Sequence, residues 1–212
     1  MKKLILPLVA LTMMLAPTKS NAQAIEEGKV IVDGYYGFGN LYNAVFKALA
    51  SSSGSNVTTG FMGPLGVRGE YLISDKVGFG LDLGYSSAKL TYDDVYTESS
   101  FDANFNYVTT STPYTSTLST AKVGVMVTFN YHFVESDNFD AYFMTGLGYG
   151  NRTFKETSTY SGYTPITVSS TFPVASRIGV GMRYFFTENI GANLGLGLGQ
   201  GGLVNAGISA KF

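Results

Sequence analysis

The segment that decides the fold is residues 190–198, which read IGANLGLGL. Apolar side chains occupy every second position, at Ile190, Ala192, Leu194, Leu196 and Leu198. Glycine or asparagine fills the positions between them. Successive side chains of a β-strand point to opposite faces, so this alternation predicts a strand with one apolar face and one small or polar face.

The same alternation recurs along the chain, most clearly at residues 77–85 and 121–133. It predicts eight strands. They are residues 29–39, 63–73, 77–90, 118–133, 139–155, 172–186, 190–199 and 203–212. Beyond residue 24 no run of about 18 apolar residues exists, so the sequence predicts no membrane-spanning helix.

The first 24 residues have the features of a secretory signal peptide. Lys2 and Lys3 give a positive start, residues 4–16 are mostly apolar, and residues 22–24 (AQA) match the small-x-small cleavage pattern. We therefore expect residues 1–24 to be a signal peptide that is removed on export, and residues 25–212 to form one domain. An N-terminal membrane anchor is the alternative.

Composition excludes several classes of function. The chain has no cysteine, which rules out disulfides, thiol catalysis and thiolate metal sites. Three of its 14 basic residues, Lys2, Lys3 and Lys19, lie in the signal, so the mature chain carries 11 basic and 15 acidic side chains. A nucleic-acid partner is not expected for such a chain, because phosphate binding needs a basic surface. No cofactor and no metal site are predicted.

The connections between the predicted strands fall into two groups. Three are short and turn-like, namely residues 74–76, 135–138 and 187–189. The others are residues 41–62 and 91–117, which are long, 158–171, which is intermediate, and 200–202, which is minimal. Short turns at one rim and longer loops at the other are typical of an outer-membrane barrel whose short side faces the periplasm.

A soluble β-sandwich is the alternative, because its strands alternate in the same way. Two observations favour a barrel. The second face of the strands is rich in glycine and small residues, as a narrow interior requires. Aromatic residues also gather just before the short turns, where interfacial girdles belong. They are Tyr71, Tyr131, Phe133, Tyr184, Phe185 and Phe186.

The last strand, LVNAGISAKF at residues 203–212, ends the chain in an aromatic residue. One face carries Val204, Ala206, Ile208, Ala210 and Phe212. With the signal sequence and the four-hairpin layout, this strand makes residues 28–212 resemble the OmpA/OmpX/OmpW-like family of small outer-membrane β-barrels. The resemblance implies an all-β fold, an eight-stranded antiparallel up-and-down transmembrane β-barrel.

The same resemblance implies a location and a set of partners. The protein would cross the inner membrane by its cleaved signal and reside in the outer membrane of a Gram-negative cell. The barrel-assembly machinery would recognise the terminal strand during biogenesis. Outer-membrane lipid and lipopolysaccharide would surround the barrel, and a larger outer-membrane complex is a further candidate partner. We expect no peptidoglycan-binding domain after the last strand, so that activity is not carried over.

If the aliphatic face points to lipid, the charged residues of the opposite parity project inward. They are Asp33, Arg68, Glu70, Asp82, Lys122, Arg152, Arg177, Arg183 and Lys211. An eight-stranded barrel is just wide enough for side chains to fill it, so charges of both signs must pair. Two interpretations stay open: a polar conduction path, or a salt-bridged plug that blocks flow. We predict no large aqueous pore.

The residues do not support an enzyme. Barrel enzymes of this size use histidine with serine and an acidic partner near the outer leaflet, and this chain has one histidine, His132. His132 lies three residues before a short turn, at the expected periplasmic end of its strand. We therefore predict no catalytic residues, and expect His132 to be a hydrogen-bonding residue of the lumen or interface.

The two long connections contain the remaining candidate functional residues. Residues 41–50 have apolar positions spaced for one short helix on the rim, or for a loop whose apolar side chains fold back onto the protein.

Residues 91–117 contain four acids that could hold divalent cations against lipopolysaccharide, or could form a solvated acidic loop. The acids are Asp93, Asp94, Glu98 and Asp102. Six aromatic residues give the same segment a contact-forming surface. They are Tyr92, Tyr96, Phe101, Phe105, Tyr107 and Tyr114.

Two functions are consistent with these sequence features. The first is a structural or interaction scaffold that displays its loops for adhesion, envelope integrity or assembly with a larger complex. The second is a narrow conduit for small or hydrophobic solutes, as in OmpW-like barrels. The charged interior favours the scaffold, because such a conduit would need an apolar lumen that opens sideways.

Overall fold

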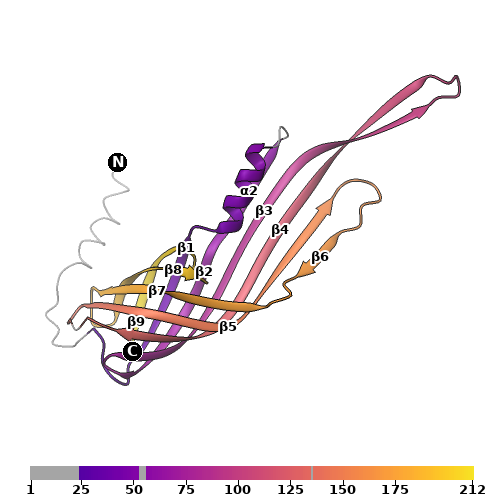
Figure 1. Cartoon of the computed structure of the whole chain (residues 1–212). Helices are drawn as coiled ribbons and strands as arrows, with labels where there is room; N and C mark the ends of the chain where they lie inside the picture. Colours follow the sequence, from indigo (N-terminus) through magenta and orange to yellow (C-terminus); the bar gives the residue numbers. More distant parts are fainter. Residues whose placement is uncertain (1–23, 53–55, 135) are drawn as a thin grey trace, which may run out of the picture.

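The protein is a ring of antiparallel strands with one helix at its mouth (Figure 1). The computed structural model describes residues 24–52, 56–134 and 136–212, so nearly all of the predicted signal peptide lies outside the described residues. The strands are β1 (Val30–Phe38), β2 (Val57–Ser74), β3 (Val77–Phe101), β4 (Tyr107–His132), β5 (Phe139–Ser158), β6 (Ile166–Ser169), β7 (Val174–Phe185), β8 (Ile190–Gly199) and β9 (Val204–Lys211). The helix is α2 (Leu41–Ser52).

Eight of these strands close into a barrel. Neighbours pair in the order β1, β2, β3, β4, β5, β7, β8 and β9. The last strand then pairs with the first over the register Ile31↔Lys211 to Phe38↔Val204. The short strand β6 pairs with β5 beyond the point where β7 begins. The predicted eight-stranded antiparallel barrel is therefore confirmed.

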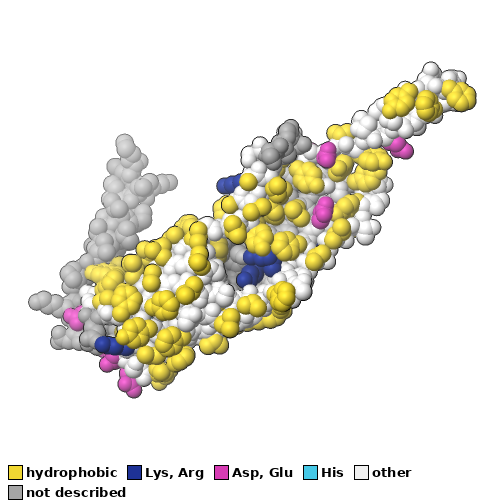
Figure 2. Space-filling model, in the orientation of Figure 1, with side chains coloured by type: hydrophobic (Ala, Val, Ile, Leu, Met, Phe, Trp, Pro, Cys, Tyr) yellow, Lys and Arg dark blue, Asp and Glu magenta, His cyan; other side chains and the backbone are white. Residues whose placement is uncertain are grey.

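The outer surface of the barrel is apolar. Leu81, Val127 and Leu147 are 57%, 58% and 67% exposed, and hydrophobic side chains cover the barrel wall in Figure 2. In a transmembrane barrel this outward parity is the one that contacts lipid. Within the described residues, no helix combines the length and apolar character needed to cross a membrane.

The structure corrects the prediction of a long loop at residues 91–117. β3 continues to Phe101 and β4 begins at Tyr107. These two strands pair with each other without interruption from Thr91↔Thr117 to Phe101↔Tyr107. The resulting hairpin projects far beyond the rest of the barrel (Figure 1). The segment is polar because it lies in water, but threonine and tyrosine are good strand formers, so polarity was a poor guide to conformation.

The segment at residues 41–62 is also more regular than a loop. Of the two alternatives for residues 41–50, the helix is correct. Asn40 caps it, because the Asn40 side-chain Oδ1 accepts hydrogen bonds from the backbone N–H groups of Tyr42 and Asn43 at 3.1 and 3.3 Å. β2 then begins at Val57, six residues earlier than predicted, and β6 lies within the predicted connection at residues 158–171.

α2 packs on the inner face of the extended strands. Phe46 is buried against Ala88 and Leu90, which share the inward parity of Asp82 on β3. The inward face of β3 thus changes from polar inside the barrel to apolar above it. This change creates a surface for the apolar side of the helix, which places α2 beside the mouth of the lumen.

Candidate functional site

Arg183 of β7 lies in the lumen and binds three carboxylates. Its Nη2 atom lies 2.8 Å from Asp33 Oδ2 and 2.7 Å from Glu70 Oε2. Its Nη1 atom lies 3.0 Å from Asp140 Oδ2. The guanidinium also lies 4.3 Å from the ring centroid of Tyr142. Since the three acids come from β1, β2 and β5, one fully buried side chain joins four strands.

His132 completes a closed ring of contacts with Arg183. Its Nδ1 atom lies 2.7 Å from Asp140 Oδ1 and its Nε2 atom lies 2.9 Å from Glu70 Oε1. Each of these two acids therefore gives one oxygen to His132 and the other to Arg183. An imidazole nitrogen bonds an ionised carboxylate only by donating, so an imidazolium satisfies both contacts at once.

A second charged layer lies beside the first. Arg68 donates from Nε to Asp82 Oδ2 at 3.0 Å, and its Nη1 lies 3.6 Å from Asp33 Oδ2. The Tyr35 hydroxyl donates to Asp82 Oδ1 at 2.8 Å. Arg68 also donates to the hydroxyl of Tyr142 at 3.3 Å. Asp33 links the two layers, because it contacts both Arg68 and Arg183.

The turn between β8 and β9 folds into the barrel instead of out into solvent. Three of its glycines, Gly199, Gly201 and Gly202, have φ angles of 106°, 90° and 77°, a conformation that glycine adopts at little cost. Gln200 between them is 9% exposed. Arg177 holds the turn by donating to the backbone carbonyls of Gln200 and Gly202.

The side chain of Gln200 extends into the lumen above the charged layers, toward β3 and β4. Its amide Nε2 donates to Asp82 Oδ1 at 2.6 Å. Its carbon and oxygen atoms fill the space beside Gly84 and Gly124, where a Cβ would lie 2.7 and 2.1 Å from the nearest atom of Gln200. Both glycines therefore make room for the inserted glutamine.

The nine residues predicted to project inward fall into three groups. Six lie in or beside the two charged layers. They are Asp33, Arg68, Glu70, Asp82, Arg177 and Arg183. Lys211 lies near the end with the short turns, where its Nζ donates to the Ala24 carbonyl at 3.3 Å and lies 5.2 Å from the Phe185 ring centroid. Lys122 and Arg152 are half-buried at the opposite end.

Sequence reasoning missed several members of the buried network. Asp140, Tyr142, Tyr35 and Gln200 were not identified, and His132 was assigned no partner. A usable signal existed for Asp140 and Tyr142, because they share the inward parity of Arg152 on β5. Nothing in the sequence pattern indicated that the β8–β9 turn folds inward.

The terminal strand carries its apolar residues on the outward face. Ile208 and Phe212 are 65% and 69% exposed, whereas Ser209 and Lys211 are buried. The backbones of Phe212 and Val30 exchange two hydrogen bonds, at 2.8 and 3.1 Å, at the seam where β9 meets β1. The other three residues of the predicted assembly signal, Val204, Ala206 and Ala210, are partly exposed. Recognition of this strand by the assembly machinery stays a prediction.

The β3–β4 hairpin presents aromatic side chains outside the barrel. At its tip Phe101, Phe105 and Tyr107 are 69%, 88% and 67% exposed. Lower down, Tyr160 packs against Tyr96 and Tyr114, with ring centroids 4.8 and 5.7 Å apart. Figure 2 shows the hydrophobic groups gathered at the tip of this projection.

Three of the hairpin's four acids make hydrogen bonds within the hairpin. Asp94 accepts from the Tyr114 hydroxyl at 3.0 Å, and Asp93 accepts from the Thr115 hydroxyl at 2.8 Å. Asp102 accepts two backbone N–H bonds in the turn, from Asn104 and Asn106. These contacts give the acids a structural role. Among the described residues, no group of three or more histidine, aspartate or glutamate side chains is arranged so that it could hold a metal ion.

A closed ring of eight strands, an apolar outer face and an ionic interior define the class of small transmembrane β-barrels. The chain belongs to the family described as outer membrane protein beta-barrel domain, whose model matches residues 7–205. Membership in this family implies that the protein resides in the outer membrane. The cleaved signal peptide stays a prediction.

Two solved barrels are similar to this chain. One is the N-terminal β-barrel domain of OprF from Pseudomonas aeruginosa, at 15% identity and a TM-score of 0.42, covering 88% of this chain and 98% of that one. The other is Ail, the attachment invasion locus protein of Yersinia pestis, at 14% identity and a TM-score of 0.37, covering 88% and 99%. A comparison with curated proteins found no match.

Proposed function

We propose that the protein is a non-enzymatic scaffold of the outer membrane, which displays the β3–β4 hairpin to a partner outside the cell. The observation that carries this proposal is the contrast between a filled lumen and a projecting, fully paired hairpin with an aromatic tip. A filled interior makes the barrel a rigid support, and exposed aromatic side chains are enriched in recognition surfaces.

Phe105 gives the tip a specific feature. Its φ angle is 62°, a left-handed conformation that costs a non-glycine residue free energy, and its side chain is 88% exposed. An exposed aromatic residue in a strained position gains nothing from burial in the protein itself. Contact with a protein or glycan partner accounts for its place there.

The contacts of His132 support the absence of catalysis. Both ring nitrogens are occupied by buried carboxylates, at the end of β4 that adjoins a short turn. A general base needs a free position within reach of a substrate, and this histidine has none.

Photo-crosslinking in intact cells tests the scaffold proposal. A photoreactive amino acid at residue 105 should give a discrete adduct with a protein or glycan, whereas the same group at lipid-facing residue 81 should give lipid adducts alone. The double substitution Phe101→Ser and Tyr107→Ser should lower the yield of the residue-105 adduct several-fold without changing barrel content, measured by circular dichroism.

Deletion of residues 94–114 separates the scaffold from a solute conduit. Asp93 and Thr115 pair directly, so an Asn-Gly turn can join them and leave the barrel intact. We expect the deletion to abolish partner binding and to leave assembly and solute uptake unchanged. A change in uptake with no loss of a partner would favour the conduit instead.

A further inference from the structure

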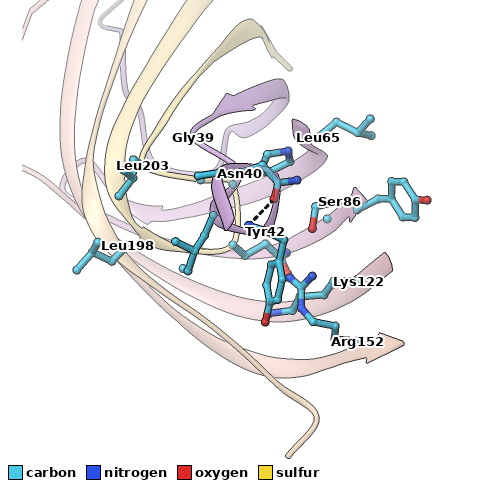
Figure 3. A pocket seen from close by; sticks show the side chains of 18 residues that line it. Gly39, Asn40, Tyr42, Leu65, Ser86, Lys122, Arg152, Leu198 and Leu203 are labelled. Atoms are coloured by element: carbon cyan, nitrogen blue, oxygen red, sulfur yellow. Dashed lines mark hydrogen bonds between the residues drawn. The ribbon is translucent and has the colours of Figure 1, made fainter. Parts of the chain in front are cut away.

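A cavity of about 470 Å³ lies at the outer mouth of the barrel, above the inserted Gln200. Its walls come from the start of α2, from the inward faces of β3, β4 and β5, and from the β8–β9 turn (Figure 3). This volume is in the range of binding sites for small molecules. Because side chains fill the lumen below Gln200, the cavity is a blind recess.

Two basic side chains line one wall of the recess. Lys122 on β4 and Arg152 on β5 stand directly opposite each other in the strand register. Both are half-buried, and Figure 2 shows basic groups in a recess beside α2. Like charges placed directly opposite in a sheet repel each other. Their juxtaposition is therefore a cost that the fold bears at this position.

The surrounding protein neutralises neither charge. Lys122 Nζ donates to the Val174 carbonyl at 3.4 Å, and Arg152 Nη1 donates to the Thr120 hydroxyl at 3.2 Å. The Arg152 guanidinium stacks 3.9 Å from the ring centroid of Tyr42. Within the described part of the chain, no carboxylate forms an ion pair with either residue. The ion pairs of Asp33, Glu70, Asp82 and Asp140 lie in the two charged layers below.

The opposite side of the recess is apolar. It is lined by Leu41 and Ala44 at the start of α2, and by Pro64 and Leu203. Lys122 is about ten residues from His132 at the periplasmic end, close to the length of a strand that spans the membrane. The basic pair therefore lies near the outer boundary of the apolar band, where a charged group meets water and a hydrocarbon chain meets leucine side chains.

We propose that this recess binds a single-chain anionic amphiphile, with its phosphate or carboxylate head on Lys122 and Arg152 and its alkyl chain along the leucine side. An anionic head neutralises the two like charges, and arginine offers a bidentate fork for it. The proposal is independent of the hairpin and its partner, because it rests on different residues.

Binding of dodecyl phosphate tests the proposal. The barrel in phosphatidylcholine nanodiscs is titrated by calorimetry with dodecyl phosphate, dodecyl maltoside and inorganic phosphate, with empty nanodiscs as the blank. We expect saturable binding of dodecyl phosphate only. The double substitution Lys122→Gln and Arg152→Gln should weaken it by about ten-fold or more, since charge-assisted hydrogen bonds are lost.

A matched control removes two exposed lysines, one on β3 and one on β5. Lys89→Gln with Lys155→Gln changes the net charge equally, and these lysines are exposed, so binding should stay as in the wild type. Ala44→Trp should fill the recess and abolish binding without altering any charge, which tests the site even if the Lys122 and Arg152 double variant fails to fold.

Several results would overturn the proposal. Equal binding of dodecyl maltoside would show that the anionic head is not needed, and equal binding of inorganic phosphate would show that the alkyl chain is not needed. Unchanged binding in the Lys122 and Arg152 double variant, or in Ala44→Trp, would place the amphiphile elsewhere. Competition by phosphatidic acid in the nanodisc would overturn the single-chain assignment in favour of a membrane lipid, whereas no competition supports it.

Discussion

At the residue scale, each buried charge of the interior depends on its partners for compensation. Arg183 contacts Asp33, Glu70 and Asp140, and none of these four side chains has more than 1% of its surface exposed. Burial of an ion costs several kcal/mol unless it is paired. Arg183 therefore contributes to stability mainly because its loss would leave three buried carboxylates with only His132 and Arg68 to balance their charge.

We predict that Arg183→Met lowers the free energy of unfolding by about 3–5 kcal/mol, the usual cost of breaking a buried ion pair. Urea unfolding of the barrel refolded into lipid vesicles measures the change. Lys155→Met, at an exposed position of β5, should change it by less than about 0.5 kcal/mol. Adding Asp33→Asn and Glu70→Gln to Arg183→Met should recover part of the loss; no recovery would contradict the pairing.

Strand parity predicted which charges face inward, but not which ones meet. Asp33 and Arg183 are far apart in the chain and come into contact because β1 and β7 face each other across the lumen. Such contacts depend on the tilt and stagger of the closed barrel. Alternation within a single strand carries no information about that stagger, which is why the partners of His132 were not foreseen.

At the scale of elements, the tip of the β3–β4 hairpin depends on one carboxylate. Asp102 accepts hydrogen bonds from the backbone N–H groups of Asn104 and Asn106 at 2.8 and 2.9 Å, and from the Asn106 side chain at 3.2 Å. We predict that Asp102→Ala increases hydrogen exchange at residues 99–109 and leaves the barrel strands unchanged. Equal exchange in both proteins would show that Asp102 does not hold the turn.

The same contacts give the tip a pH dependence. Hydrogen bonds from Asn106, and then from Asn104, hold the pKa of Asp102 below its usual value of 3.8. Because the folded-state pKa is lowered, this contribution is present above the usual value and is lost as the pH falls through the lowered one. The amide resonances of Asn104 and Asn106 should therefore titrate with a midpoint below 3.8; a midpoint at or above it would contradict the prediction.

The helix at the mouth depends on a single aromatic anchor. Phe46 is 4% exposed in a cluster with Ala88 and Leu90. Phe46→Ala should reduce the local stability of α2 by about 3 kcal/mol, since a core phenylalanine is lost. Hydrogen exchange of residues 41–52 checks this. Val45→Ala, at an exposed position of the same helix, is the control and should have little effect.

Whether a strand or helix could be predicted from the sequence depended on what surrounds it. Inside the membrane, lipid and lumen impose opposite polarities on alternate residues, so the eight strands were visible in the pattern. Above the membrane, water solvates both faces of the hairpin and the alternation disappears, although the backbone remains paired. The strand at residues 91–101 was therefore missed, whereas the apolar spacing of α2 left the helix open as one of two alternatives.

At the scale of the whole molecule, the barrel separates two regions of different charge. The periplasmic half and centre hold acids and bases in contact with one another, whereas the outer mouth holds Lys122 and Arg152 with no acid in contact within the described residues. Gln200 lies between them and donates a hydrogen bond to Asp82. The molecule thus combines an interior filled by side chains with an open recess at its mouth.

A filled interior predicts the electrical behaviour of the protein. In planar bilayers the refolded barrel should show no stable conductance of porin size, because the ring of Arg183, Glu70, His132 and Asp140 and the layer of Gln200 block the lumen in series. Gln200→Ala should also stay closed, since both charged layers below Gln200 remain in place. Stable porin-sized steps from the wild type would contradict the packed interior, and steps from Gln200→Ala alone would show that the lower ring does not block flow by itself.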